Sequence, residues 1–364
     1  MAKQGPTTYL YTVNNDLQRN GVAVLRRNAD GSLTEIAGSP FSTGGKGLGG
    51  GDIDQQGAVR VHGEFVLAVN PGSDSVAVLR KGEGGKLQPV AGSPFPSGGL
   101  APISLTVHGD LVYVANQAPF FAKPTTGPNV TGFRMGTDGT LTPIPGSTIA
   151  FLDLHGPAQV EFNPGGETVA VTSGFQEHAT SQVHGYKVQA DGTLEEGPGS
   201  PAHATGASGN VGFAWSSAGD RIYVTNFRRS AVTVFDVDKQ TGGVKQVGRA
   251  HQTKGSAACW GVLSSDGTLL YVANFVSNTI STLAVRADGT LTFLSAVKRR
   301  GGHQPDTKDL ALSKDGQFLY AVASTARQVA TFTIGGKGKL KELPAPKSPA
   351  KLRAGGAILG LVVD

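Results

Sequence analysis

Short runs of alternating apolar and polar or small residues recur along this chain, and most of them end in asparagine. The runs are rich in β-branched and aromatic residues, which favour strands over helices. Seven such runs occur: Tyr11–Asn14, Leu67–Asn70, Tyr113–Asn116, Val169–Thr172, Tyr223–Asn226, Tyr271–Asn274 and Tyr320–Ala323. Each predicts a buried β-strand.

A second phrase, in which a glycine turn is followed by a hydrophobic residue, also occurs seven times. Ala29-Asp30-Gly31-Ser32-Leu33 is typical of it. Asp-Gly between apolar runs predicts a tight hairpin with a primed turn, because glycine tolerates positive φ and aspartate bonds its own backbone. The turn glycines are Gly31, Gly85, Gly139, Gly192, Gly242, Gly289 and Gly338. Their spacing of roughly 50 residues is typical of a propeller array.

A further glycine turn precedes most of the apolar runs, as in Asn163-Pro164-Gly165-Gly166, so each repeat holds four strands, A to D, in a meander. The predicted fold is all-β: one seven-bladed β-propeller domain over residues 1–364. The chain begins with a B-type strand, Thr8 to Asn14, and ends with an A-type pattern, Gly356 to Val363. Pairing these two segments would close the first blade and remove two open sheet edges.

Composition narrows the class of protein. Cys259 is the one cysteine, which excludes an internal disulfide framework, and no apolar run is long enough to span a membrane. Because of the same lack of an apolar run, no membrane partner is expected. The net charge of +5 is modest and not gathered into a stripe with aromatics, so no nucleic-acid partner is expected either. Residues 1–6 lack a signal-peptide core, which favours a cytoplasmic location, with secretion from a longer precursor as the alternative. A monomer without metal or other cofactor is expected.

Several longer phrases resemble the lactonase-type seven-bladed propellers, which include bacterial 6-phosphogluconolactonase and fungal 3-carboxy-cis,cis-muconate cyclase. The resemblance covers nearly the whole chain. It rests on Ser42–Gly51, Pro102–Gly109, Pro157–Val160, His251–Thr253 and Ala257–Trp260.

This resemblance implies a site at the mouth of the central channel that uses histidine, arginine and glutamate. Where family members often have His-Pro-His before the fourth A strand, this chain has His155, displaced by one residue, and Ala158. Where they often have Pro-Arg, it has Pro305-Asp306, and Lys308 supplies the nearest positive charge. Opening or closing a lactone needs a carbonyl polariser and a proton donor or acceptor.

Comparing blades points to the same region. Seven residues before the A–B turn glycine stand Gln159, Gly212, Trp260 and Asp309, which differ in size and charge although the repeat is otherwise regular. Adaptation of each A strand to its neighbours would also explain this divergence. The predicted catalytic residues are His155, Lys308 and Asp309. The predicted substrate-binding residues are Gln159, Asn210, His251, Trp260, His303 and Asp306.

Two functions remain open at this point. The first is a cofactor-independent enzyme that hydrolyses or isomerises a small anionic lactone or related carbohydrate-derived ligand, since the channel residues and the basic excess suit an anionic substrate. The second is a non-catalytic propeller that binds a protein or glycan partner.

Overall fold

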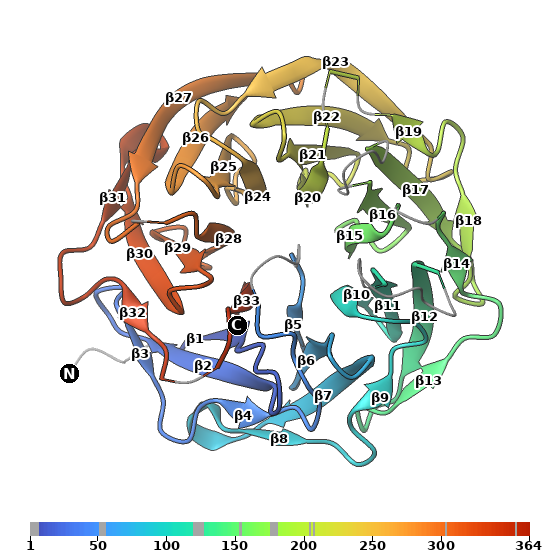
Figure 1. The fold of residues 1–364 in the computed structure, drawn as a ribbon. Coiled ribbons are helices and arrows are strands. Elements are labelled where there is room, and N and C mark those ends of the chain that lie inside the picture. The colour runs from blue at the N-terminus through green and yellow to red at the C-terminus, as the bar shows by residue number, and fades with distance from the viewer. Residues whose placement is uncertain are drawn as a thin grey trace.

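Seven antiparallel sheets surround one central axis, which confirms the predicted seven-bladed all-β propeller (Figure 1). The computed structural model describes residues 7–50, 56–118, 127–152, 155–174, 181–203, 205–206, 208–302, 304–353 and 355–364. In each blade the A strand lies innermost, beside the axis, and the D strand lies at the rim.

The strands follow the repeat closely. Blade one holds β33 (Leu359–Val363), β1 (Tyr9–Val13), β2 (Gly21–Arg27), β3 (Leu33–Glu35) and β4 (Phe41–Ser42). Blade two holds β5 (Val59–His62), β6 (Phe65–Asn70), β7 (Ser75–Lys81), β8 (Leu87–Pro89) and β9 (Phe95–Pro96), with the short 3₁₀ helix η1 (Glu83–Gly85). Blade three holds β10 (Pro102–His108), β11 (Leu111–Asn116), β12 (Asn129–Met135), β13 (Leu141–Pro143) and β14 (Ile149–Ala150). Blade four holds β15 (Pro157–Phe162), β16 (Thr168–Ser173), β17 (Gln182–Val188), β18 (Leu194–Glu196) and β19 (Ala202–His203).

The last three blades are built in the same way. Blade five holds β20 (Asn210–Trp215), β21 (Arg221–Asn226), β22 (Ala231–Val237) and β23 (Val244–Gln252). Blade six holds β24 (Ala258–Leu263), β25 (Leu269–Asn274), β26 (Thr279–Val285) and β27 (Leu291–Lys298). Blade seven holds β28 (Thr307–Leu312), β29 (Phe318–Ala323), β30 (Gln328–Ile334), β31 (Leu340–Glu342) and β32 (Ala350–Lys351), with η2 (Gly336–Gly338).

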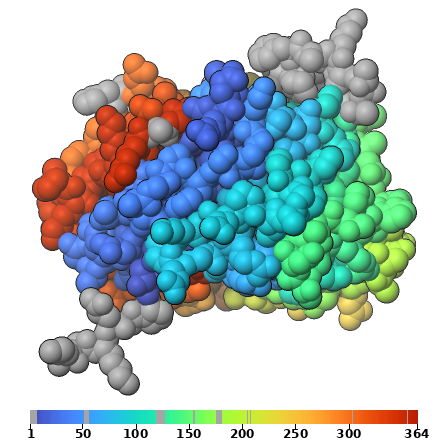
Figure 2. Space-filling view, turned by 90° about the horizontal axis from the view of Figure 1, so that it is seen from below, coloured from blue at the N-terminus to red at the C-terminus, as the bar shows by residue number. Residues whose placement is uncertain are grey.

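The two ends of the chain close the ring as predicted. β33 pairs antiparallel with β1, with Leu10 opposite Val363. The Thr12 hydroxyl donates to the Leu359 carbonyl at 3.2 Å. Figure 2 shows the red C-terminal residues directly beside the blue N-terminal ones. Blade one is therefore assembled from both ends of the sequence, and the ring has no open seam.

The C–D turns differ in one detail from the prediction. All seven turn glycines adopt positive φ, for example +83° at Gly31, but the aspartates that precede four of them do not. The Gly31 N–H donates to the Asn28 carbonyl at 2.9 Å, and Asp30 Oδ1 accepts the Ser32 N–H at 3.0 Å. The primed turn predicted for the Asp-Gly phrases was therefore wrong: Asp30-Gly31 closes an ordinary turn, with only the glycine in the left-handed region. In blades two and seven, where Gly84 and Lys337 precede the turn glycine, both residues adopt positive φ.

Candidate functional site

The A strands form the wall of the central channel, and half of their backbone groups face away from any partner strand. Side chains from the preceding blade satisfy some of these groups. Ser104 Oγ accepts the Val160 N–H at 3.2 Å, and Gln159 accepts the Phe213 N–H at 2.6 Å. Because buried backbone groups must be paired, polar residues on these strands tie one blade to the next.

Gln159, predicted to bind substrate, is fully buried and fully engaged in this way. Its Oε1 accepts the Phe213 N–H, and its Nε2 contacts both the Phe213 carbonyl at 3.2 Å and Glu161 Oε2 at 2.7 Å. Gln159 therefore joins blades four and five and fixes the position of Glu161.

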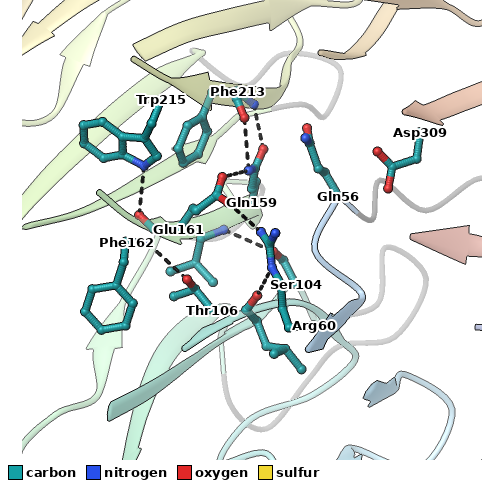
Figure 3. A network of polar contacts seen from close by, with 12 residues as sticks. Gln56, Arg60, Ser104, Thr106, Gln159, Glu161, Phe162, Phe213, Trp215 and Asp309 are labelled. Carbon is teal, nitrogen blue, oxygen red and sulfur yellow. Dashed lines mark hydrogen bonds and ion pairs between the residues drawn. The ribbon is translucent and has the colours of Figure 1, made fainter. Parts of the chain in front are cut away.

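Glu161 forms an ion pair with Arg60 that spans three blades (Figure 3). Arg60 starts on β5, donates through Nε to the Leu105 carbonyl of blade three at 3.1 Å, and brings Nη2 to 3.0 Å from Glu161 Oε1 of blade four. Nη2 is buried against Glu161, while the Arg60 side chain as a whole is 23% exposed. A guanidinium has five N–H donors, so an arginine that is paired and still partly exposed can also donate to an oxygen of a ligand.

This pair lines a cavity of about 540 Å³ at the end of the channel where the A–B turns lie. Its wall is made by the second halves of the A strands and includes Arg60, Glu161, Trp215, Asp309 and Lys314. The sequence placed the site at the opposite end, where the A strands begin.

Gln56 lies at the inner limit of this cavity and reaches across the channel. Its Nε2 donates to the Gly261 carbonyl of blade six at 3.2 Å, although Gln56 itself precedes β5 of blade two. Its Oε1 lies beside Gly212, where an added Cβ would stand 2.0 Å from that oxygen and 2.2 Å from Trp260 Cδ1. The missing side chain at Gly212 is what makes room for Gln56 and Trp260.

Asp309 is the predicted catalytic residue that does line this cavity (Figure 3). Its Oδ1 accepts the Leu310 N–H at 2.7 Å, and its Oδ2 accepts the Leu361 N–H of the closing strand at 2.9 Å. Burial raises the pKa of this carboxyl to about 7, while these hydrogen bonds and the positive charge of Arg60 act in the opposite direction. A carboxyl with this pKa exchanges protons readily near neutral pH.

Lys308 and Trp260 lie together but apart from Asp309, because neighbouring residues of a strand point to opposite faces of the sheet. Lys308 Nζ lies 5.3 Å from the centroid of the Phe275 ring and 6.0 Å from that of the Trp260 ring. Both Lys308 and Trp260 are buried, and neither lines the cavity.

Asp306 and Asn210 serve the fold at the other end of the channel. The Asp306 carboxylate accepts backbone N–H groups of Thr325 and Ala326, which fixes the B–C connection of its own blade. Asn210 accepts from Asn226 Nδ2 at 2.8 Å and is fully buried. Both side chains already use their polar atoms within the protein.

Two of the three histidines predicted for the site, His155 and His251, do not line the cavity. His155 is half-buried in the connection before β15, and its N–H donates to the Leu152 carbonyl at 3.0 Å. His251 lies on the rim strand β23, opposite Val232, and burial lowers its pKa. His303 lies outside the described residues.

Sequence reasoning missed Arg60, Glu161 and Gln56. A signal for Glu161 existed: five residues before the A–B turn glycine, blades four to seven have Glu161, Ala214, Val262 and Ala311, and only one is charged. Arg60 does not appear in this comparison, because the A–B turn of blade two is shorter and Arg60 is not five residues before its turn glycine. Within the described ranges, no group of three His, Cys, Asp or Glu side chains is placed to hold a metal ion.

Comparisons with known proteins agree with this architecture. A family model described as lactonase, seven-bladed β-propeller, matches residues 156–352. A Bacteroides fragilis protein provisionally named a 6-phosphogluconolactonase has a similar structure, with 18% identity, 100% of this chain and 99% of that chain covered, and a TM-score of 0.76. A Lactobacillus plantarum protein has 19% identity, coverage of 98% and 99%, and a TM-score of 0.76. The periplasmic gluconolactonase of Pseudomonas aeruginosa has 21% identity, coverage of 97% and 99%, and a TM-score of 0.74. No curated protein matches the sequence.

Proposed function

The chain belongs to the lactonase seven-bladed β-propeller family, and on this premise we propose that it hydrolyses a small anionic lactone in the cavity at the A–B end of the channel. One observation carries the proposal: the wall of one cavity holds a partly exposed arginine, Arg60, and a carboxyl with a pKa of about 7, Asp309. Names of two similar structures refer to sugar lactones, so this class is the first to test.

In the proposed reaction, ionised Asp309 takes a proton from water while the water oxygen attacks the lactone carbonyl carbon. The carbonyl oxygen becomes negatively charged, and the Arg60 guanidinium stabilises that charge. The bond from the carbonyl carbon to the ring oxygen then breaks, and protonated Asp309 returns its proton to the released ring oxygen. Water is thereby added across the ester bond, and the product is an open hydroxy acid.

Glu161 and Gln159 have supporting roles in this scheme. Glu161 holds the Arg60 guanidinium at 3.0 Å, and Gln159 Nε2 holds Glu161 at 2.7 Å. Both are positioning residues, because they act through Arg60. Arg60 and Lys314 on the cavity wall also favour a substrate that carries a carboxylate or phosphate.

The proposal is tested with a panel of sugar lactones, their phosphorylated forms, muconate-derived lactones and simple γ- and δ-lactones. For any substrate turned over, Asp309→Asn is expected to lower kcat/KM by about 10²-fold or more, through loss of the general base. Arg60→Gln is expected to lower it by about 10²-fold, through loss of oxyanion stabilisation.

Two control variants accompany the panel. Arg80→Gln removes an arginine of the same blade whose carboxylate partner, Glu64, is exposed, and it is expected to leave turnover unchanged. His155→Ala is expected to do the same, because His155 does not line the cavity. Loss of turnover in His155→Ala with full activity in Asp309→Asn would move the reaction to the other end of the channel. Absence of turnover on the whole panel would favour the non-catalytic binding protein.

A further inference from the structure

The face of the ring formed by the B–C and D–A connections carries uncompensated positive charge over blades five to seven. These connections are residues 226–231, 250–258, 274–279, 298–307, 323–328 and 349–358. They contain one acidic residue, Asp306, and its side chain is buried. The exposed basic residues of these connections, named here the basic crescent, include Arg229, Lys254, Lys298, Arg300 and Lys351. Arg353 is also exposed there, but it pairs with Glu35 at 3.7 Å.

The opposite face, formed by the A–B and C–D turns, is different. Its turns carry acidic residues among their cations, and several of these form ion pairs, such as Arg27 with Asp315 at 2.5 Å and Arg134 with Asp110 at 2.6 Å. Arg286, Lys337 and Lys339 on this face have no carboxylate within 4.0 Å in the described ranges. In the basic crescent, no carboxylate of the described ranges lies within 4.0 Å of Arg229, Lys254, Lys298 or Lys351. The unpaired charges repel one another, which costs stability unless an anionic partner compensates for them.

Exposed apolar side chains lie on the same face as the basic crescent. Val276 is 49% exposed on the B–C connection of blade six, and Leu17 is 57% exposed on that of blade one. Leu152, which is 74% exposed, lies on the D–A connection of blade four. Three of the four large apolar side chains most exposed in the described part of the chain therefore share one face.

We infer that this face docks onto the surface of an anionic lipid bilayer, with the basic crescent against the headgroups and Val276 and Leu17 at the acyl boundary. Cations alone would suit any polyanion, but the exposed apolar side chains on the same face gain free energy where hydrocarbon is available. A nucleic acid would instead require aromatic side chains free to stack on bases.

This contact is peripheral. No helix in the described ranges is long and apolar enough to cross a bilayer. The sequence led us to expect no membrane partner. That expectation rested on the lack of an apolar run long enough to span a bilayer. It left out the basic residues that the loops of three blades bring to one face.

The test is co-sedimentation of the full chain with phosphatidylcholine vesicles that contain either no or 30% phosphatidylglycerol. We expect binding only to the anionic vesicles, weakened by added salt. The variant Arg229→Gln/Lys254→Gln/Lys351→Gln is expected to bind about 10²-fold more weakly, since each basic residue at an anionic membrane surface contributes about fivefold. Val276→Ser is expected to weaken binding several-fold without changing its salt dependence.

The matched control removes the same number of charges from the opposite face, as Arg286→Gln/Lys337→Gln/Lys339→Gln. These three side chains are exposed on C–D turns, and their removal is expected to leave vesicle binding unchanged. Equal loss in both triple variants would overturn the inference, because binding would then follow net charge alone. Absence of binding to anionic vesicles at low salt, or crescent-dependent retention on heparin without vesicle binding, would overturn it as well. Thermal unfolding of each variant checks that the fold is intact.

Discussion

Replacing Asp309 with asparagine should change how the stability of the protein depends on pH. In the unfolded chain this carboxyl ionises near its ordinary value of 3.8, and burial raises its pKa to about 7 in the folded protein. Between these two values the folded state holds a proton that the unfolded state has lost. Stability therefore falls as the pH rises through this window, and it levels off above pH 7. Asparagine cannot ionise, so the variant lacks this contribution.

The expected size follows from the two pKa values. The difference corresponds to about 4 kcal/mol in the free energy of unfolding. A chain of 364 residues has an unfolding entropy near 0.8 kcal/mol per kelvin at roughly 2 cal/mol/K per residue, so the effect on Tm is about 5 °C.

The assay is thermal unfolding of wild type and Asp309→Asn between pH 4 and 8. The Tm of the wild type minus that of the variant should decrease by about 5 °C across this range, since other groups titrate alike in both proteins. Asparagine also places an NH₂ group against one backbone donor, Leu310 or Leu361, which adds a penalty that does not depend on pH. A Tm difference that stays constant from pH 4 to 8 would refute a raised pKa at Asp309.

Three further predictions follow from the channel. If a lactone is turned over, kcat/KM should rise with pH through about 7, because Asp309 acts as a base only when it is ionised. A kcat/KM that does not change between about pH 5.5 and 8.5 would contradict this role. Gly212→Ala should destabilise the protein by about 1–3 kcal/mol in chemical denaturation, because the new Cβ meets a fully buried indole at 2.2 Å; Gly336→Ala, with nothing within 4 Å, is its control. Gln159→Met should cost about 1–3 kcal/mol, because the Phe213 N–H and carbonyl lose their partner; an unchanged unfolding midpoint would show that this bridge between blades is dispensable.

The architecture of the ring was predictable because it depends on local signals repeated seven times. Alternation of apolar residues in runs such as Tyr223–Asn226 identifies a strand whatever surrounds it, and glycines such as Gly31 mark turns by their conformational freedom. Closure also followed, because Gly356–Val363 has the pattern of an A strand without a B strand after it.

The composition of the site was not predictable to the same degree. Asp309 was identified from its place in the repeat, but the Arg60–Glu161 pair joins blades two and four across the inner strand of blade three. Such a contact depends on the reach of a long side chain along a curved wall, which no spacing within one repeat encodes. The same holds for Gln56, which crosses the channel to blade six.

The location proposed for the site along the axis was also beyond the sequence. Lys308 and Asp309 are neighbours on β28, but their side chains point in different directions. The Lys308 ammonium lies over aromatic rings, whereas the Asp309 carboxyl lies on the cavity wall. Strand register decides this direction, and the irregular pairing between Thr307 and Leu310 shifts that register locally.

The central claim, that the cavity at the A–B end of the channel is the ligand site, is tested most directly by a crystal structure with a bound hydroxy acid such as gluconate. We predict that its carboxylate lies within hydrogen-bond distance of the Arg60 guanidinium and that a hydroxyl group faces Asp309. A hydroxy acid bound instead beside His155, at the opposite end of the channel, would contradict the account.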